Sequence, residues 1–306
     1  MPELRFDGRV AVITGGGRGL GRAYALLLAS RGAKVVVNDP GVSMKGEGTN
    51  EGPAEDVARE IRASGGEAVA NTDSVATPQG GAAIVNTALD NYGRIDILIH
   101  NAGITRGAPI HEMTQEEFDL VLDVHLRGAF HVVRPALPHM YKDHYGRIVL
   151  TSSINGIYGN YRQCHYSAGK AGLIGLSNVI ALEGAAEGVK CNVIIPAALT
   201  RMAEGKDTSA FPPMTSEMVA PTVGWLCHES CSITGEMLIA LAGRVARAYI
   251  AESPGIYKPA WTIEDVAANL DTIRSTDNPF IASVVPSGHV DHLKYSFEMV
   301  RKAGGT

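Results

Sequence analysis

Thr14-Gly-Gly-Gly-Arg-Gly-Leu-Gly21 is the stretch of sequence that decides the fold of this chain. The apolar run Arg9–Thr14 leads into it, and a segment of helix length, Gly19–Arg31, leads out of it. Glycines at a strand-to-helix turn let the backbone approach a pyrophosphate, and the positive end of the helix dipole favours that charge. A glycine triplet alone says little, but the strand and the helix around it supply the context of a dinucleotide site.

Apolar runs and helix-length segments alternate along the chain. The strand-like runs are Arg9–Thr14, Lys34–Asn38, Glu67–Ala70, Ile95–His100, Arg147–Leu150 and Lys190–Ile195, with Met237–Leu241 as a candidate seventh. The segments of helix length are Gly19–Arg31, Pro53–Ser64, Pro78–Asn91, Thr114–Tyr141 and Cys164–Glu187. Continuous apolar runs are typical of strands that are buried on both faces. The repeated units predict an α/β fold of the Rossmann type, with a doubly wound parallel sheet and right-handed crossovers.

Two segments extend this minimal fold. Pro40–Pro53 is a long glycine-rich loop after the second strand, and a tail follows Ala242. The tail contains one helical pattern, Thr262–Arg274, whose opening Thr-Ile-Glu-Asp is typical of a capped helix start. Because no Gly/Ser-rich linker precedes the tail, we predict a single NAD-binding catalytic domain over residues 1–245. Residues 246–306 are expected to form a C-terminal extension that packs on the same domain.

The composition is that of a soluble globular protein. Of 306 residues, 45% are hydrophobic and 19% are charged, and the formal net charge is −5, which leaves no basic footprint for nucleic acid. No window approaches the roughly 18 uninterrupted apolar residues of a transmembrane helix. The first residues lack the layout of a signal peptide, and Thr306 does not close a peroxisomal Ser-Lys-Leu-type signal, so we expect a cytoplasmic protein.

The cysteines predict neither disulfides nor a metal site. Four of them in the whole chain are too few for a disulfide framework. Cys227-His-Glu-Ser-Cys231 offers two thiols and one imidazole, and no second ligand pair follows it. We therefore interpret these thiols as buried and helix-borne, and expect no metal.

Asp39 points to the identity of the dinucleotide. It ends the second strand, twenty residues after Gly19, where a carboxylate accepts hydrogen bonds from the adenosine ribose and repels a 2′-phosphate. Arg18 has the opposite tendency, because a basic residue in this turn can meet a 2′-phosphate. We weigh Asp39 more heavily, since like charges repel strongly at close range, and predict NAD. An Asp that merely starts a turn before Pro40 is the alternative.

Tyr166 and Lys170 form a second constellation, four residues apart on one face of a predicted helix. A neighbouring ammonium lowers the pKa of a phenol from its ordinary value of about 10. Ser153 lies thirteen residues before Tyr166, just past a strand end, where open parallel sheets place ligands. A phenol tuned in this way acts as a general base when an alcohol is oxidised, and as a general acid in reverse.

Together these motifs resemble the short-chain dehydrogenase/reductase family. The resemblance implies that Ser153 hydrogen-bonds the substrate oxygen, that Tyr166 transfers the proton, and that Lys170 lowers the pKa of the tyrosine and holds the nicotinamide ribose. Asn101-Ala-Gly103 is similar to the second half of the family's Asn-Asn-Ala-Gly motif, in which His100 here replaces the first Asn.

The same resemblance extends the cofactor site to other loops. Asp73-Ser74 is similar to the adenine-contacting segment, and Pro196–Thr200 stands where the family's loop flanks the nicotinamide, with Ala197 in place of the usual Gly. The predicted cofactor-binding residues are Gly15, Arg18, Gly19, Leu20, Gly21, Asp39, Asp73, Ser74, Asn101, Gly103, Tyr166, Lys170, Pro196, Ala198, Leu199 and Thr200.

His125 departs from the family pattern. It lies in Asp123-Val-His-Leu-Arg-Gly128, where the family usually has an Asn that helps to hold a water linking the Lys to solvent. A neutral imidazole also donates and accepts hydrogen bonds, so a catalytic proton relay is one reading of His125. A hydrogen-bonded core histidine is the other.

Further stretches, such as Gly156-Ile-Tyr-Gly-Asn160 and Trp225–Cys231, are similar to the (3R)-hydroxyacyl-CoA dehydrogenase branch of the family. That branch implies NAD-dependent interconversion of a (3R)-hydroxyacyl-CoA and its 3-oxoacyl-CoA. The alternatives are a hydroxysteroid or steroid-side-chain dehydrogenase, a ketoreductase for carrier-linked substrates, and a non-catalytic dinucleotide sensor. Intact Ser153, Tyr166 and Lys170 argue against the sensor, which needs no proton chemistry.

The long helices predict a homodimer or homotetramer. Thr114–Tyr141 and Cys164–Glu187 are apolar over more than one face, so a single domain would leave part of their surface uncovered. The apolar residues in question are Val121, Leu122, Phe130, Val133, Leu173, Leu176, Val179 and Ile180.

Overall fold

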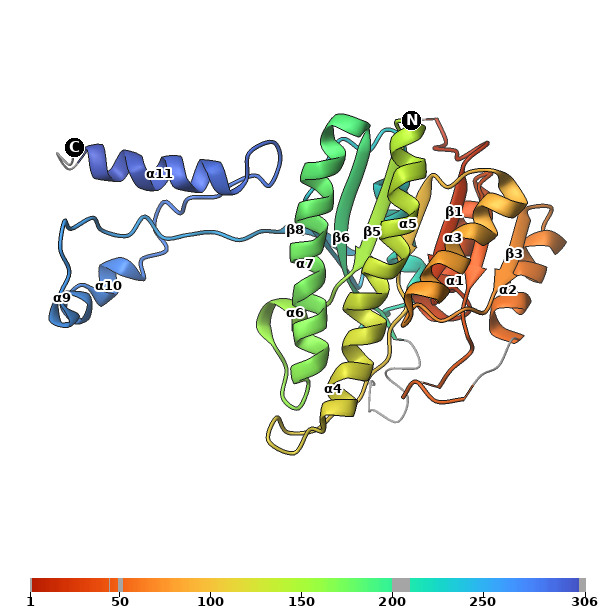
Figure 1. The fold of residues 1–306 in the computed structure, drawn as a ribbon, viewed down its shortest axis with the longest axis horizontal. Helices are drawn as coiled ribbons and strands as arrows, with labels where there is room; N and C mark the ends of the chain where they lie inside the picture. The colour runs from red at the N-terminus through yellow and green to blue at the C-terminus, as the bar shows by residue number, and fades with distance from the viewer. Residues whose placement is uncertain (1, 44, 49–51, 200–209, 303–306) are drawn as a thin grey trace. The chain divides into compact units, whose positions relative to one another are not determined.

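The computed structural model describes residues 2–43, 45–48, 52–199 and 210–302 (Figure 1). Contacts divide the chain into two compact units, Met1–Arg247 and Ala248–Thr306. The predicted packing of residues 246–306 on the catalytic domain stays a prediction.

The first unit is built on an eight-stranded sheet with the order β3-β2-β1-β4-β5-β6-β7-β8. Strands β1 to β7 run parallel, which confirms the predicted doubly wound Rossmann-type fold. The strands are β1 (Val10–Thr14), β2 (Lys34–Asn38), β3 (Glu67–Asn71), β4 (Ile97–His100), β5 (Gly146–Thr151), β6 (Val189–Ala197), β7 (Met237–Leu241) and β8 (Arg244–Ala248).

The central strands are buried along their whole length, as continuous apolar runs predict. Every residue of β1, β4 and β5 is buried. At the edge, β8 was not predicted. It follows β7 through the two-residue turn Ala242-Gly243, in which both residues have positive φ, as a tight β-hairpin requires.

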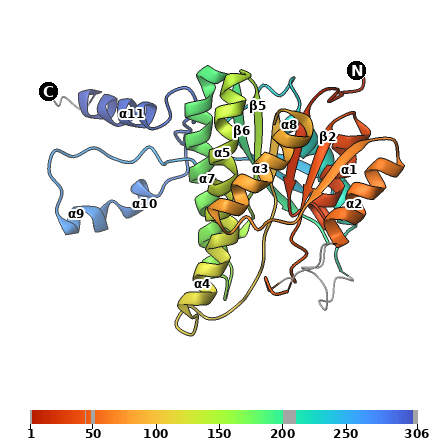
Figure 2. The same cartoon turned by 45° about the vertical axis from the view of Figure 1, so that its right-hand side comes forward.

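Helices cover both faces of the sheet (Figure 2). Helices α1, α2 and α8 pack together in one layer, and α3, α5 and α7 in the other. The bounds are α1 (Gly19–Ser30), α2 (Gly52–Ala63), α3 (Pro78–Tyr92), α4 (Gln115–Leu122), α5 (Gly128–Lys142), α6 (Asn155–Tyr158), α7 (Cys164–Gly184) and α8 (Ala220–Cys227). Single 3₁₀ turns occur at Ala185–Glu187 and Ser216–Met218.

The predicted helix Thr114–Tyr141 is not continuous. Thr114 and Glu117 form a reciprocal capping box that starts α4. A π turn, Asp123–Arg127, then separates α4 from α5. Such turns depart from the regular helical ladder and are frequent at functional sites, and this one carries His125.

The second unit contains α9 (Ile263–Ala268), α10 (Leu270–Ile273) and α11 (His289–Lys302). The prediction of one helix over Thr262–Arg274 is wrong in two ways. The helix is interrupted at Asn269, whose side-chain amide donates to the Asp265 carbonyl and competes with the backbone ladder. The later α11 went unpredicted, and none of the described side chains of this unit is fully buried.

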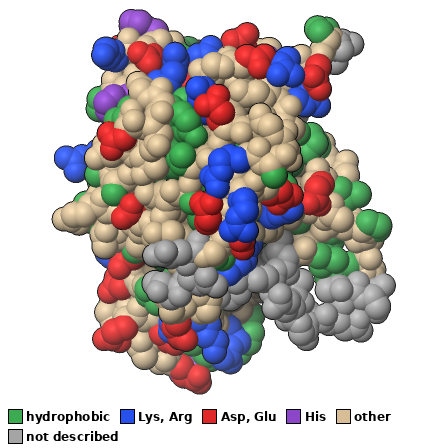
Figure 3. Space-filling view, turned by 90° about the vertical axis from the view of Figure 1, so that its right-hand side faces the viewer, with side chains coloured by type: hydrophobic (Ala, Val, Ile, Leu, Met, Phe, Trp, Pro, Cys, Tyr) green, Lys and Arg blue, Asp and Glu red, His purple; other side chains and the backbone are tan. Residues whose placement is uncertain are grey.

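The surface carries mixed charge. On the face shown in Figure 3, Lys and Arg side chains are interspersed with Asp and Glu. Within the described part of the chain, no helix is long and apolar enough to cross a membrane. Cys227 and Cys231 are both buried, as predicted, and burial raises the pKa of both thiols. Cys227 ends α8, whereas Cys231 lies beyond the helix, so the helix-borne assignment is wrong for Cys231.

Candidate active site

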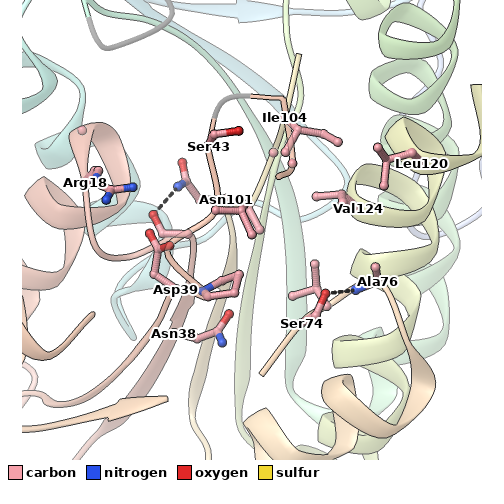
Figure 4. Close-up of a pocket in the computed structure, with 18 of the residues that line it drawn as sticks. Arg18, Asn38, Asp39, Ser43, Ser74, Ala76, Asn101, Ile104, Leu120 and Val124 are labelled. Carbon is pink, nitrogen blue, oxygen red and sulfur yellow. Dashed lines mark hydrogen bonds between the residues drawn. The ribbon is translucent and has the colours of Figure 1, made fainter. Parts of the chain in front are cut away.

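The strand order reverses between β1 and β4, and in open parallel sheets ligands bind outside the carboxyl ends of the strands at such a point. A cavity lies there (Figure 4). Its lining comes from the turn after β1 and the start of α1, the end of β2 and the loop after it, the segments after β3 and β4, the helix α4 and the π turn. These residues are Gly15, Arg18, Gly19, Leu20, Asn38, Asp39, Pro40, Val42, Ser43, Gly46, Ser74, Val75, Ala76, Asn101, Ala102, Gly103, Ile104, Leu120 and Val124.

The glycine turn is closed by neighbours that leave no room for side chains. A Cβ on Gly21 would lie 2.1 Å from the Gly15 carbonyl oxygen and 2.8 Å from Asn101 Nδ2. Asn101 Nδ2 donates to that same carbonyl at 3.1 Å. The backbone amides of Asn101 and Ala102 both donate to Thr14 Oγ1 at 3.1 Å. The ends of β1 and β4 are thus tied into one rigid cradle, which fits a pyrophosphate at the start of α1.

Asp39 and Arg18 both lie on the cavity (Figure 4). The Asp39 carboxylate is nearly buried and accepts from the amides of Gly17 at 3.1 Å and Gly41 at 2.8 Å. Each carboxylate oxygen keeps a further lone pair, so a ribose hydroxyl can still donate to it. Arg18 Nη1 is buried and has no hydrogen-bond partner among the described residues. This orphaned donor and the cradle around Gly21 are the features that fit a dinucleotide.

The remaining predicted cofactor residues lie in different places. Ser74, Asn101 and Gly103 line the cavity, whereas the Asp73 carboxylate, which is not part of the lining, accepts from Asn71 Nδ2 at 2.7 Å. Pro196 is the second-last residue of β6, which ends at Ala197 at the same edge of the sheet, and Ala198 and Leu199 follow the strand. Thr200 lies outside the described residues.

Ser153, Tyr166 and Lys170 are brought together by the end of β5 and the start of α7. Ser152 Oγ donates to the Lys170 carbonyl at 2.7 Å, and Lys170 Nζ donates to the Thr151 carbonyl at 2.5 Å. These two bonds hold the first turns of α7 against the strand end. The Ser153 hydroxyl hydrogen-bonds the Tyr166 phenol, and the ammonium of Lys170 lies 5.6 Å from the centre of the tyrosine ring.

The electrostatics of this pair differ from the prediction. Burial raises the pKa of Tyr166, and only the hydrogen bond from Ser153 lowers it. Burial also lowers the pKa of Lys170, to about 7. We predicted that Lys170 would lower the pKa of Tyr166, but desolvation has the larger effect. Both side chains are buried, and burial disfavours the phenolate as well as the ammonium.

His125 lies against the tyrosine. Its fully buried ring stands edge-on to Tyr166, with centroids 5.0 Å apart and an interplanar angle of 76°. Its Nε2 is 2.8 Å from the Ile104 carbonyl oxygen and 3.2 Å from the Ile104 amide nitrogen. Its Nδ1 has no partner among the described residues. Burial, followed by the charge of Lys170, holds the pKa of His125 well below its ordinary range, so the ring is neutral.

Two other buried histidines were not predicted as site residues. His165 Nδ1 accepts the Tyr166 amide at 2.7 Å and so satisfies a free donor in the first turn of α7. His100 ends β4 and hydrogen-bonds both Thr14 and the backbone of His125. The sequence held a signal for each: His165 directly precedes Tyr166, and His100 replaces the first Asn of the family motif. Neither signal indicates which group the imidazole would hydrogen-bond.

The chain is similar to known dehydrogenases. The sequence profile of the short chain dehydrogenase family matches residues 9–209. The peroxisomal multifunctional enzyme type 2 of Drosophila melanogaster is 48% identical over 254 residues, which cover 83% of this chain and 42% of that enzyme. The structure of the full-length enzyme aligns with a TM-score of 0.80 and 38% identity, over 97% of this chain and 51% of that chain.

Two further relatives extend the comparison. The peroxisomal hydratase-dehydrogenase-epimerase of Neurospora crassa is 42% identical over 300 residues, 95% of this chain and 32% of that protein. A crystal structure of a short chain dehydrogenase from Mycobacterium avium has a TM-score of 0.77 and 39% identity, and covers 87% of this chain and 94% of that chain. The chain therefore spans less than half the length of the two curated relatives. The family resemblance drawn from the motifs is confirmed.

The two readings of His125 predict different outcomes for His125→Asn and His125→Leu. If His125 relays protons, the Asn variant keeps most of its turnover, while the Leu variant loses about tenfold or more, because an apolar side chain holds no connecting water. Since the pKa of His125 is well below its ordinary value, its acid limb in the pH profile of the parent lies below about pH 6.5.

Turnover per folded molecule and melting temperature are measured on the same preparations. His228→Leu is the matched control, because His228 is also buried but contacts Arg5 and Ser230. Full turnover in a folded His125→Leu protein would show that His125 is only a core residue.

Proposed function

This chain belongs to the short-chain dehydrogenase family, and we propose that it interconverts a (3R)-hydroxyacyl-CoA and its 3-oxoacyl-CoA with NAD. It is an oxidoreductase of that family and uses a nicotinamide dinucleotide. The observation that carries the proposal is that the end of β5 and the start of α7 bring Ser153, Tyr166 and Lys170 together: Ser153 hydrogen-bonds Tyr166, and Lys170 Nζ lies 5.6 Å from the centre of the tyrosine ring.

The proposed chemistry assigns one task to each side chain. A bound nicotinamide dinucleotide supplies the acceptor for the hydride that leaves the carbinol carbon. Ser153 donates a hydrogen bond to the substrate oxygen, and the Tyr166 phenolate takes the hydroxyl proton as the carbonyl forms. Lys170, fixed on the Thr151 carbonyl, holds the ribose and favours the phenolate while it is charged.

The hydroxyacyl thioester is favoured because one relative combines a dehydrogenase with a hydratase in the same protein. A hydratase adds water across a double bond and so produces an alcohol, and a dehydrogenase in the same protein can oxidise that alcohol. The Neurospora crassa relative is named for both activities. This chain aligns with only part of it, so the thioester remains our proposal for this chain. The compartment also stays a prediction: the sequence favours the cytoplasm, whereas these relatives are named as peroxisomal.

The proposal predicts NAD-dependent oxidation of (3R)-hydroxyacyl-CoA and its loss in Tyr166→Phe. The Phe ring still packs, but the oxygen that carries the proton is absent, so turnover falls by at least about a hundredfold while NAD still binds. Absorbance of reduced nicotinamide is followed with acyl-CoA, hydroxysteroid and simple aliphatic alcohols. Tyr158→Phe is the control, since that tyrosine is 81% exposed on α6. Retention of turnover within about tenfold would remove Tyr166 from the mechanism.

We also predict a preference for NAD over NADP that depends on Asp39. Asp39→Ala removes both the acceptors for a ribose and the repulsion of a 2′-phosphate, so the ratio of kcat/KM values for NAD and NADP falls by about tenfold or more. Asp56→Ala is the control, because that carboxylate lies on α2 in an exposed pair with Arg59. A clear NADP preference in the parent would mean that the buried Arg18 donor outweighs Asp39.

We propose a homodimer through α5 and α7, which pack side by side. Of the apolar residues expected to form this surface, Val121, Val133, Leu173 and Ile180 are instead buried within the subunit. Phe130 and Val179 are each 50% exposed, and Leu182, also on α7, is 38% exposed. These three side chains support a narrower interface than the sequence indicated.

The dimer predicts that light scattering at micromolar concentration gives twice the chain mass of 32.3 kDa. The double variant Phe130→Glu, Val179→Glu should be monomeric, because each partner would face like charges at the symmetric contact. Ile110→Glu is the control, since Ile110 is 73% exposed outside both helices. A parent protein that scatters only as a monomer would exclude the dimer.

A further inference from the structure

His100 joins the cofactor cradle to the turn under the reactive tyrosine. It is the last residue of β4, it is fully buried, and its backbone partner on β1 is Thr14. Its Nδ1 lies 3.2 Å from Thr14 Oγ1, and its Nε2 lies 3.1 Å from the carbonyl oxygen of His125. One imidazole therefore spans two elements that the chain brings together only through folding.

The donors and acceptors around Thr14 fix which nitrogen of His100 carries the proton. Thr14 Oγ1 accepts from the amides of Asn101 and Ala102, which occupies both of its lone pairs. Its hydroxyl hydrogen must therefore donate to His100 Nδ1. The only ring proton is then on Nε2, and it points at a carbonyl that can only accept.

A charged His100 would break this arrangement, because a second ring N–H would face a hydroxyl without a free lone pair. The charged group that faces the ring is Lys170, and the neighbouring imidazole is His125. Burial, followed by the charge of Lys170, lowers the pKa of His100 to about 3, which agrees with the neutral ring deduced from the contacts.

The His125 carbonyl belongs to the π turn Asp123–Arg127. The orientation of this turn sets the position of the His125 ring, which rests edge-on against Tyr166. The ring also meets Gly103, where a Cβ would come within 2.6 Å of Cε1. A shift of the turn would therefore move the ring against the tyrosine or against the backbone of the cofactor cradle.

We propose that His100 is a positioning residue that couples two sites: through Nε2–H it holds the π turn beneath Tyr166, and through Nδ1 it holds the cofactor cradle. The inference rests on the proposed function for the roles of Tyr166 and the cradle. The two ring nitrogens make separate hydrogen bonds, so a substitution can remove one bond and keep the other.

The test uses His100→Gln and His100→Asn. The Gln amide reaches the Nε2 position and keeps the donor to the His125 carbonyl, but it loses the acceptor for Thr14. The Asn side chain keeps an acceptor near the Nδ1 position and loses the donor to the turn. Each variant therefore lacks one buried hydrogen bond, and both should melt at similarly lowered temperatures.

We expect the two variants to lose different properties. His100→Asn lowers kcat by about tenfold with little change in the Kd for NAD, whereas His100→Gln weakens NAD binding by about tenfold with little change in kcat. His228→Asn and His228→Gln are the controls, because His228 is also bonded through both nitrogens: Nδ1 to the Ser230 hydroxyl and amide, and Nε2 to the Arg5 carbonyl. Equal kcat and equal Kd in the two His100 variants would overturn the proposal.

A second measurement tests the proposed role of His100 in the parent protein, without a substrate or a variant. ¹⁵N NMR of the parent protein reports the tautomer of each histidine, and the proposal requires His100 to be neutral with its proton on Nε2 from pH 6 to 8. A cationic ring or a proton on Nδ1 would overturn it. Turnover is compared on whichever alcohol the parent oxidises best, so an incorrect thioester assignment leaves the test intact. A parent that oxidises no alcohol would defeat the proposed function, and the tautomer and the NAD Kd would still decide the role of His100.

Discussion

The parallel register of the sheet aligns Asn71, Asn38, Thr14, His100 and Leu150 in one row across five neighbouring strands. Four of these five residues are polar, although the rows before them are almost wholly apolar. Each functional loop leaves the sheet within three residues of this row. The cofactor turn, Asp39, Asn101 and Ser153 are therefore neighbours because of backbone pairing, before any side chain contributes.

The polar row also stabilises the loops that leave it. Asn38 Nδ2 donates to Asn71 Oδ1 and to the Asp73 carbonyl, both at 2.8 Å, which fixes the segment after β3. Thr14 Oγ1 accepts from the amides of Asn101 and Ala102 and so fixes the segment after β4. Buried polar groups cost free energy unless they are paired, so the bonds made by Asn38 Nδ2 and Thr14 Oγ1 favour this register. The row thus specifies one register of the sheet as well as the shape of the site.

The features that the sequence predicted are those that depend on local pattern. Continuous apolar runs identified the central strands β1, β4 and β5 because these are buried on both faces. The partly buried strands β3 and β7 also carry short apolar runs, and the glycine turn was identified because it stands between a strand and a helix. The π turn has no such signal: Asp123–Arg127 continues the helical pattern, and its irregularity accompanies contacts from His100 and Gly103, which are distant in sequence. The hydrogen-bond partners of His100 and His165 could not be predicted either, because no local sequence pattern indicates them.

The sign of the tyrosine pKa shift also depends on tertiary structure. The spacing of Tyr166 and Lys170 correctly places an amine near a phenol, but spacing carries no information about solvent. Once α7 is fixed on β5, both groups are buried, and desolvation opposes phenolate and ammonium alike. The surrounding imidazoles of His100 and His125 are neutral for the same reason and add no competing positive charge near Lys170. The site therefore concentrates hydrogen-bonding groups around Tyr166 while keeping fixed charge low, so that the proton equilibrium of the tyrosine responds strongly to any charge that a ligand brings into the cavity.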